Sequence, residues 1–310
     1  MAFALITHPA SRRHVTPEGH PERVARIEVA EAALSAPEFA SALRFEAPAA
    51  TDEALRRAHG AAHLKTLAAR APASGFVAID PDTYLCPDTL EAARRAAGAN
   101  VMAVDKVLSG EAKTAFCALR PPGHHAERMT AMGFCFYSNA AIAALHALEA
   151  HGLARVAIAD FDVHHGNGTQ DILAGEARAV FCSSHEWPLF PGTGRPSERG
   201  VGNIFNAPLR AGSGRAAFER AWEDTLLPAI DAHAPELIII SAGFDAHVRD
   251  PLATLELETE DFAWITGRIC DLAERHCGGR VVSTLEGGYD LRGLADSVAA
   301  HARVLKDRAG

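Results

Sequence analysis

The chain has 310 residues, of which 48% are hydrophobic, and a formal net charge of −9. This length and composition are typical of a globular enzyme with a substantial buried core. The acidic balance argues against general nucleic-acid binding, which needs a basic face to neutralise phosphates, and it is compatible with a cationic substrate.

Strands and helices alternate along most of the chain. In order, we expect a strand at residues 2–7, a helix at 22–34, a short helix at 51–60 and another helical run that ends at 70. A helix at 89–108, a strand at 114–119, a helix from 138, a strand at 156–159 and a helix at 169–173 come next. Strands follow at 178–182, 203–208, 235–241 and 280–284, with helices around 218–230, 262–272 and from 291. Long loops rich in Pro and Gly lie at 72–89 and 185–202. The alternation implies right-handed crossovers, so we expect one α/β domain over residues 1–310, with a mostly parallel sheet, helices on both faces and long loops at one edge.

Cysteine usage and the first residues bear on the compartment. Six cysteines occur without a C-x-x-C pair, so neither a thiolate zinc site nor a disulfide framework is indicated. The opening MAFALITHPASRR lacks a positive n-region and a sufficient apolar run, and no stretch of about twenty apolar residues follows. We expect a cytoplasmic protein with no membrane partner.

The stretch VAIADFDVHHGNGTQ, at residues 156–170, carries the strongest chemical signal. Ligands of α/β sheets gather at the carboxyl ends of strands, and alternation along an extended backbone would project Asp160, Asp162 and His164 to one side. A carboxylate and an imidazole two residues apart can bind one divalent metal, which leaves the other carboxylate free to orient a neighbouring group. Asp245 follows the apolar run PELIIISAGF and is the expected third ligand. Asp162, His164 and Asp245 would leave metal positions open for water and substrate.

Two further polar clusters follow expected strands. In RPPGHHA, an irregular turn allows His124 and His125 to face one cavity, where imidazole can take a proton from water and return it to a leaving amine. In LEGGYD, Tyr289 follows two glycines. The phenol could belong to the core or hydrogen-bond to a developing oxyanion.

Taken together, RPPGHHA, GFCFYSN, DFDVHHGNGTQ, PGTG, SAGFDAHVRDPL and LEGGY resemble the zinc-dependent histone deacetylase superfamily, especially its class II-like branch and the bacterial histone deacetylase-like amidohydrolases. These motifs span residues 120–289, and HPER at 20–23 also looks familial. The resemblance implies an arginase-like fold with an eight-stranded parallel sheet. It also implies one Zn²⁺ per chain, held by Asp162, His164 and Asp245.

Carried over by position, the resemblance makes His124 and His125 the catalytic pair, with Tyr289 as the oxyanion donor. Asp160 would orient His124. Asn167 stands where class I members have Asp, so an amide would accept from His125 and raise its basicity less than a carboxylate does.

The substrate implied by the resemblance is an acylated lysine or a small acylated amine. Gly133, Phe134 and Phe190 match the walls of the family's acyl-lysine tunnel. Polyamine-selective members carry an acidic residue after the D-P of the metal-ligand loop, whereas this chain has Leu252. We therefore expect acetyl-lysine-type amides to be preferred over acetylpolyamines, although Asp82 in the 72–89 loop could supply a charge from elsewhere.

Two other features are implied by position in the family. Arg23 matches an arginine near the acetate-release channel. Asp160, with carbonyls near Ser183 and Ser184, resembles a monovalent-cation site, so a bound K⁺ is implied.

Two alternative functions remain at this point, and a homo-oligomer is possible under any of them. An arginase-like ureohydrolase needs two manganese ions and the pattern D-x-D-x-x-D-P. Here the run is Asp245-Ala-His247-Val-Arg-Asp250, so one carboxylate is replaced. The other alternative is a non-catalytic, metal-containing regulatory module.

Overall fold

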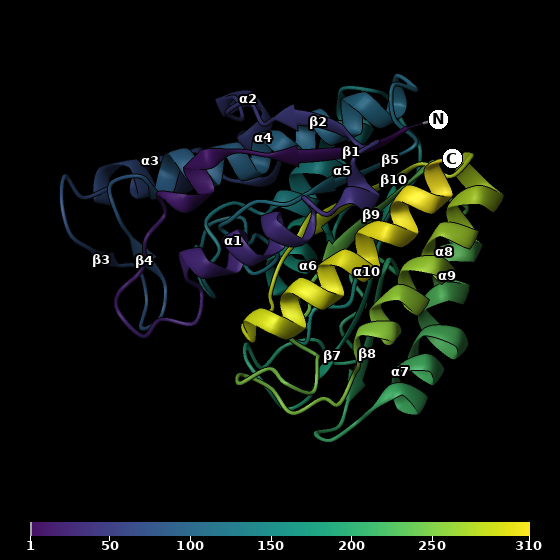
Figure 1. Ribbon diagram of the computed structural model, residues 1–310. Helices are drawn as coiled ribbons and strands as arrows, with labels where there is room; N and C mark the ends of the chain where they lie inside the picture. The colour runs from purple at the N-terminus through teal and green to yellow at the C-terminus, as the bar shows by residue number, and fades with distance from the viewer. Residues whose placement is uncertain (1) are drawn as a thin grey trace.

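The computed structural model describes residues 2–310, so Met1 of the expected domain lies outside the described residues. An eight-stranded sheet runs through the molecule in the order β2-β1-β5-β10-β9-β6-β7-β8 (Figure 1). Its strands are β1 (Phe3–Thr7), β2 (Leu43–Glu46), β5 (Thr114–Cys117), β6 (Val156–Asp160), β7 (Ala179–Glu186), β8 (Ile204–Leu209), β9 (Leu237–Ala242) and β10 (Val281–Leu285). All neighbouring strands are parallel. The expected eight-stranded α/β architecture is confirmed.

Helices cover both faces of this sheet (Figure 1). One face carries α1 (Val24–Ala33), α7 (Arg215–Ala221), α8 (Leu227–His233), α9 (Thr259–Cys277) and α10 (Leu291–Ala309). The other carries α2 (Asp52–Ala58), α3 (Ala61–Arg70), α4 (Thr89–Leu108), α5 (Asn139–Glu149) and α6 (Asn167–Leu173). Short 3₁₀ turns lie at η1 (Pro9–Arg12) and η2 (Pro37–Phe39). Within residues 2–310, none of the helices has the length and apolarity needed to cross a bilayer.

Strand sequences explain this two-sided burial. In β9 every residue is buried, and alternate side chains enter opposite cores. Ile238 and Ile240 pack on the α9–α10 side, whereas Leu237 and Ile239 pack on the α4–α5 side. A strand buried on both faces reads as a continuous apolar run, which is how PELIIIS reads in the sequence.

Three features depart from the expected elements. The edge strand β2 and the antiparallel pair β3 (Val77–Ala78) and β4 (Tyr84–Leu85) lie in segments for which no strand was expected. The helix expected around residues 218–230 has a π-helical turn at Trp222–Leu226 between α7 and α8. Pro228 lies in the first turn of α8, and because its nitrogen carries no hydrogen it cannot donate to an α-helical bond across this junction.

The order of the central strands determines where the polar clusters lie. β5, β10, β9 and β6 are successive neighbours, and all their carboxyl ends lie at one edge of the sheet. The segments that leave these ends carry every cluster singled out in the sequence. Residues from four distant parts of the chain therefore meet at one edge.

Candidate active site

Three possible metal ligands converge where β6 and β9 end. His164 Nδ1 lies 3.2 Å from Asp162 Oδ1 and 3.2 Å from Asp245 Oδ2. All three residues are buried, and their ligand atoms lie within 4.8 Å of one another. Two buried carboxylates side by side are costly unless a cation compensates their charge, so this donor set fits a divalent metal with nitrogen and oxygen ligands.

Backbone amides and two glycines hold these carboxylates. Gly287 N donates to Asp162 Oδ2 (2.8 Å), and Val163 N donates to Asp245 Oδ1 (2.9 Å). A Cβ atom on Gly243 would collide with the Asp162 carboxylate, and one on Gly287 would collide with that of Asp245. The close approach of backbone to carboxylate therefore requires glycine at both positions.

The two adjacent histidines have different partners. His124 Nδ1 lies 3.1 Å from Asp160 Oδ2, and His125 Nδ1 lies 2.8 Å from Asn167 Oδ1. The Asn167 amide is oriented by Glu127, because its nitrogen donates to Glu127 Oε1 at 2.8 Å. Asn167 Oδ1 thus accepts from His125 Nδ1, which leaves His125 Nε2 without a proton in the neutral ring.

These partners separate the pKa values of the pair. Burial disfavours an imidazolium at both positions, but the negative charges of Asp162 and Asp160 raise the pKa of His124 well above its usual range. Burial and the positive charges of His124 and His164 lower the pKa of His125 well below its usual range. Burial also raises the pKa of Asp160 to about 6, despite the opposing charge of His124. Two neighbouring imidazoles with such different proton affinities suit different catalytic tasks.

Tyr289 follows β10 and is only 8% exposed. Its backbone N donates to Asp250 Oδ2 at 2.7 Å, and the Arg26 guanidinium lies 4.8 Å from the centre of its ring. Burial raises the pKa of the phenol well above its usual range, despite the opposing charge of Arg26. The hydroxyl stays protonated at neutral pH and can donate a hydrogen bond.

A cavity of about 390 Å³ leads to these groups. It is lined by His20, Pro21, Pro81, Asp82, Tyr84, His125, Gly133, Phe134, His164, Leu189, Phe190, Leu252 and Tyr289. The Phe134 ring meets the Tyr289 ring edge to face at 5.9 Å, and Phe190 meets His125 at 5.1 Å. The four expected substrate-contacting residues therefore line one cavity together with His125, His164 and Tyr289; the four are Gly133, Phe134, Phe190 and Leu252.

The role expected for Arg23, near an acetate-release channel, stays a prediction. Arg23 is the exposed N-cap of α1, whereas Arg26, one turn later, is fully buried beside Tyr289. Arg26 Nε donates to Gly288 O (2.6 Å), and its Nη2 donates to Glu286 O (2.6 Å). Helical phase could have identified it, because Arg26 shares the buried face of α1 with Ile27 and Ala30.

Glu286 was also missed in the sequence. Its Oε2 accepts from Gly123 N (2.7 Å) and His124 N (3.1 Å), so it fixes the turn that carries both histidines. Burial raises its pKa to about 7. LEGGYD contains this residue, but its partners lie more than 160 positions earlier in the chain.

The residues of the expected potassium site are neighbours in the sheet. Asp160 on β6 pairs with Ser183 on β7, and both are fully buried. The two serine hydroxyls already have partners, since Ser183 Oγ bonds His185 Nδ1 (3.0 Å) and Ser184 Oγ accepts from Trp222 Nε1 (3.0 Å). A bound K⁺ at this place remains a prediction.

Comparison with known proteins gives a consistent picture. Residues 20–305 match the family model described as "Histone deacetylase domain". A histone deacetylase-like amidohydrolase of Pseudomonas aeruginosa is 42% identical over 248 residues, covering 78% of this chain and 65% of the relative. The human polyamine deacetylase HDAC10 is 39% identical over 234 residues, covering 72% of this chain and 34% of the relative. Among solved structures, the crystal structure of an HDA15 HD domain superposes with a TM-score of 0.94 at 34% identity, covering 99% of this chain and 88% of that one.

Proposed function

Because the chain belongs to the histone deacetylase family, we propose that it is a zinc-dependent amidohydrolase that removes acetyl or related acyl groups from acyl-lysine-type amides. The observation that carries the proposal is the meeting of Asp162, His164 and Asp245 with the histidine pair and Tyr289, beside a cavity that His125, His164 and Tyr289 line. We propose that residues 1–310 act as one catalytic domain.

Asp162, His164 and Asp245 would hold the metal. When bound, a divalent ion supplies a Lewis acid that polarises the scissile carbonyl and lowers the pKa of a water molecule. The buried donor set of two carboxylates and one imidazole suits zinc and leaves room for water and substrate.

The histidines would divide the proton transfers. His125 is held neutral with Nε2 free, so it is the group that accepts a proton from water and later donates one to the leaving amine. His124, beside Asp160, retains its proton and stabilises negative charge that develops during attack. The protonated Tyr289 hydroxyl would donate a hydrogen bond to the same developing oxyanion.

The residues beyond the ligands support one metal ion rather than two. Asp250 is occupied by backbone amides, with Oδ2 accepting from Tyr289 N and Oδ1 from Leu252 N (3.0 Å). His247 Nδ1 accepts from Arg249 N (3.1 Å). The positions that would bring a second manganese in a ureohydrolase are therefore used to fix the loop.

The lining of the cavity favours acyl-lysine over polyamine substrates. Leu252 offers only apolar contact at the place of the acidic residue in polyamine-selective members. The second candidate is an acetylpolyamine amidohydrolase, favoured by the half-buried Asp82 in the cavity wall. Burial and a hydrogen bond with Asp80 raise the pKa of Asp82. We propose acyl-lysine as the main substrate class.

The test compares purified, metal-loaded protein on acetyl-lysine peptides, acetylputrescine and acetylspermidine. We expect the kcat/KM of the peptides to be the highest, and a tenfold preference for either polyamine would overturn the substrate assignment. Removal of metal by a chelator should abolish hydrolysis, and Zn²⁺ should restore it. Undiminished turnover by metal-free Asp245→Ala protein would overturn the assignment of the metal site.

A further inference from the structure

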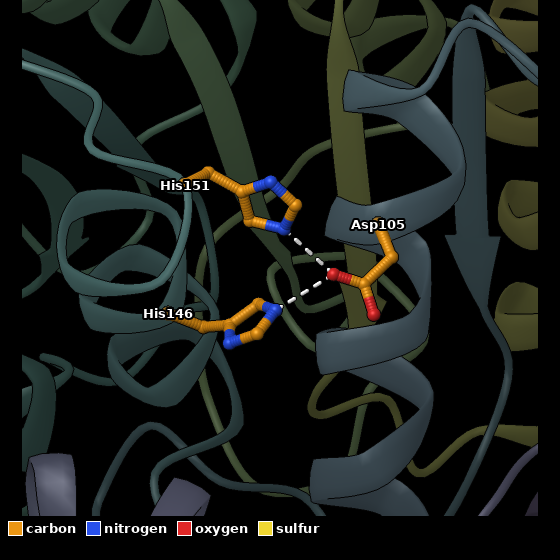
Figure 2. Close-up of side chains that lie close together, drawn as sticks. All are labelled: Asp105, His146 and His151. Atoms are coloured by element: carbon orange, nitrogen blue, oxygen red, sulfur yellow. Dashed lines mark hydrogen bonds and ion pairs between the residues drawn. The ribbon is translucent and has the colours of Figure 1, made fainter.

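A second cluster of possible metal ligands lies on the surface between α4 and α5. His146 Nε2, on α5, lies 2.7 Å from Asp105 Oδ1, on α4. His151 Nε2, just beyond the end of α5, lies 2.7 Å from the same oxygen. Figure 2 shows both imidazole rings directing a nitrogen at this one carboxylate. The three ligand atoms lie within 4.8 Å of one another, as they do in the catalytic cluster.

The cluster is separate from the catalytic site. α5 begins at Asn139, directly after the loop that carries the catalytic histidines, and its eleven residues span about 16 Å to the end that carries this cluster. α5 is almost wholly buried, so its C-terminal end is held firmly against α4. The position of His146 is therefore set by packed helices, whereas His151 lies at an exposed position in the bend that follows α5.

Hydrogen bonding alone is the competing explanation for this cluster, and the two explanations require different positions of Arg57. Arg57 Nη1 lies 3.3 Å from His146 Nδ1, where it can donate only if that nitrogen carries no proton. In that tautomer Nε2 carries the proton and donates to Asp105. A metal on Nε2 requires the opposite tautomer, so Arg57 must turn away. Arg57 can turn away without losing all its partners, because it also forms ion pairs with Glu53 (2.7 Å) and Glu149 (3.4 Å).

We propose that Asp105, His146 and His151 form a second metal site, which takes a divalent ion with a preference for nitrogen and oxygen ligands, such as Zn²⁺. Two imidazoles and one carboxylate are a suitable donor set for zinc, and the partial exposure of His151 and Asp105 leaves room for water to complete the coordination. Glu53 and Glu149 outweigh the charge of Arg57 nearby and favour a cation. The ion would join α4 to α5 and stabilise the folded chain.

Zinc stoichiometry tests this proposal. The full chain is freed of metal, dialysed against buffered micromolar Zn²⁺ and examined by elemental analysis. We expect one ion fewer per chain in His151→Asn and in the isosteric Asp105→Asn than in the wild type. The control His233→Asn removes a histidine at the end of another helix and should bind as the wild type does. Because the readout is the difference of one ion, it does not depend on whether the catalytic cluster holds zinc.

Two further measurements address the role of the site. Arg57→Gln should increase the affinity of this site severalfold, because it removes a positive charge and frees His146 Nδ1 to carry the proton. Zn²⁺ should raise the Tm of the wild type more than that of His151→Asn, since an ion that binds only the folded state stabilises it. Equal zinc content in the wild type and in both ligand variants, or a difference that emerges only at millimolar Zn²⁺, would overturn the proposal.

Discussion

The substitution Tyr289→Phe isolates a single hydrogen-bond donor. The ring should stay in place, because the backbone N of Tyr289 is held by Asp250 and the ring packs against Arg26 and Phe134. Only the hydroxyl is lost. Loss of one oxyanion donor lowers kcat by about 10²–10³, or about 2.7–4 kcal/mol of transition-state stabilisation. KM should change little, because the interaction strengthens only as charge develops on the oxygen.

Steady-state kinetics on an acetyl-lysine peptide, together with zinc content and Tm, make the measurement. Tyr84→Phe is the matched control, since Tyr84 lines the same cavity but its hydroxyl donates to Pro81 O (3.0 Å). We expect a large fall in kcat for Tyr289→Phe alone, with unchanged Tm and metal content. Near-native kcat in Tyr289→Phe, or an equal loss in Tyr84→Phe, would refute the assignment of Tyr289 as the oxyanion donor.

Three other substitutions probe separate parts of the structure. Gly133→Ala should lower kcat/KM at least tenfold with the fold retained, because Gly133 has φ = 55° and an added Cβ would lie 2.6 Å from the His125 ring. Gly175→Ala is the control, since a Cβ there would enter open space, and equal activity of the two variants would contradict this account. Glu22→Gln should lower the free energy of unfolding by about 3–5 kcal/mol in denaturant unfolding, because it leaves the buried charges of Arg26 and Arg120 uncompensated. A loss below about 1 kcal/mol would contradict this role of Glu22. The buried partners also lower the pKa of Glu22 in the folded state. Its contribution to folding stability is therefore fully present above the ordinary glutamate pKa, and it is lost as the pH falls through the lowered pKa of the folded state. Leu252→Glu should shift the ratio of kcat/KM values toward acetylpolyamines, and an unchanged ratio would exclude this position as a determinant.

The local sequence pattern was sufficient to predict elements of the fold where the sequence carries a strong periodic signal. The buried strands and α4 follow from apolar runs and helical spacing. The meeting of Asp162, His164 and Asp245 follows from polar residues placed just after such strands. The edge strand β2 gave no such signal, because it has four residues with alternate side chains exposed. Even the correct strands leave the sheet order open, so the adjacency of β6 and β9, which brings Asp245 to Asp162, had to come from the structure.

Buried charges were harder to predict for a different reason. A fully buried Arg26 or Glu286 is stable only with partners from distant segments, and those partners cannot be read from its immediate neighbours in the chain. Arg23 was chosen from its motif position, whereas the helical phase of α1 selects Arg26. Asp82 enters the cavity wall because the β3–β4 pair folds the 72–89 loop back toward the site.

The position of β10 has a consequence for how the protein is made. β10 is the last strand of the chain, yet it lies in the middle of the sheet, between β5 and β9. The residues before 281 include one set of adjacent strands, β9, β6, β7 and β8, which carries the three possible metal ligands. They also include a second set, β2, β1 and β5, which leads into the histidine pair. In the sheet, β10 joins these two sets of strands, and this same strand leads into Tyr289. A nascent chain that has not reached β10 therefore lacks both the strand that joins the two sets and Tyr289, so we expect no hydrolysis before residues 281–289 have been synthesised.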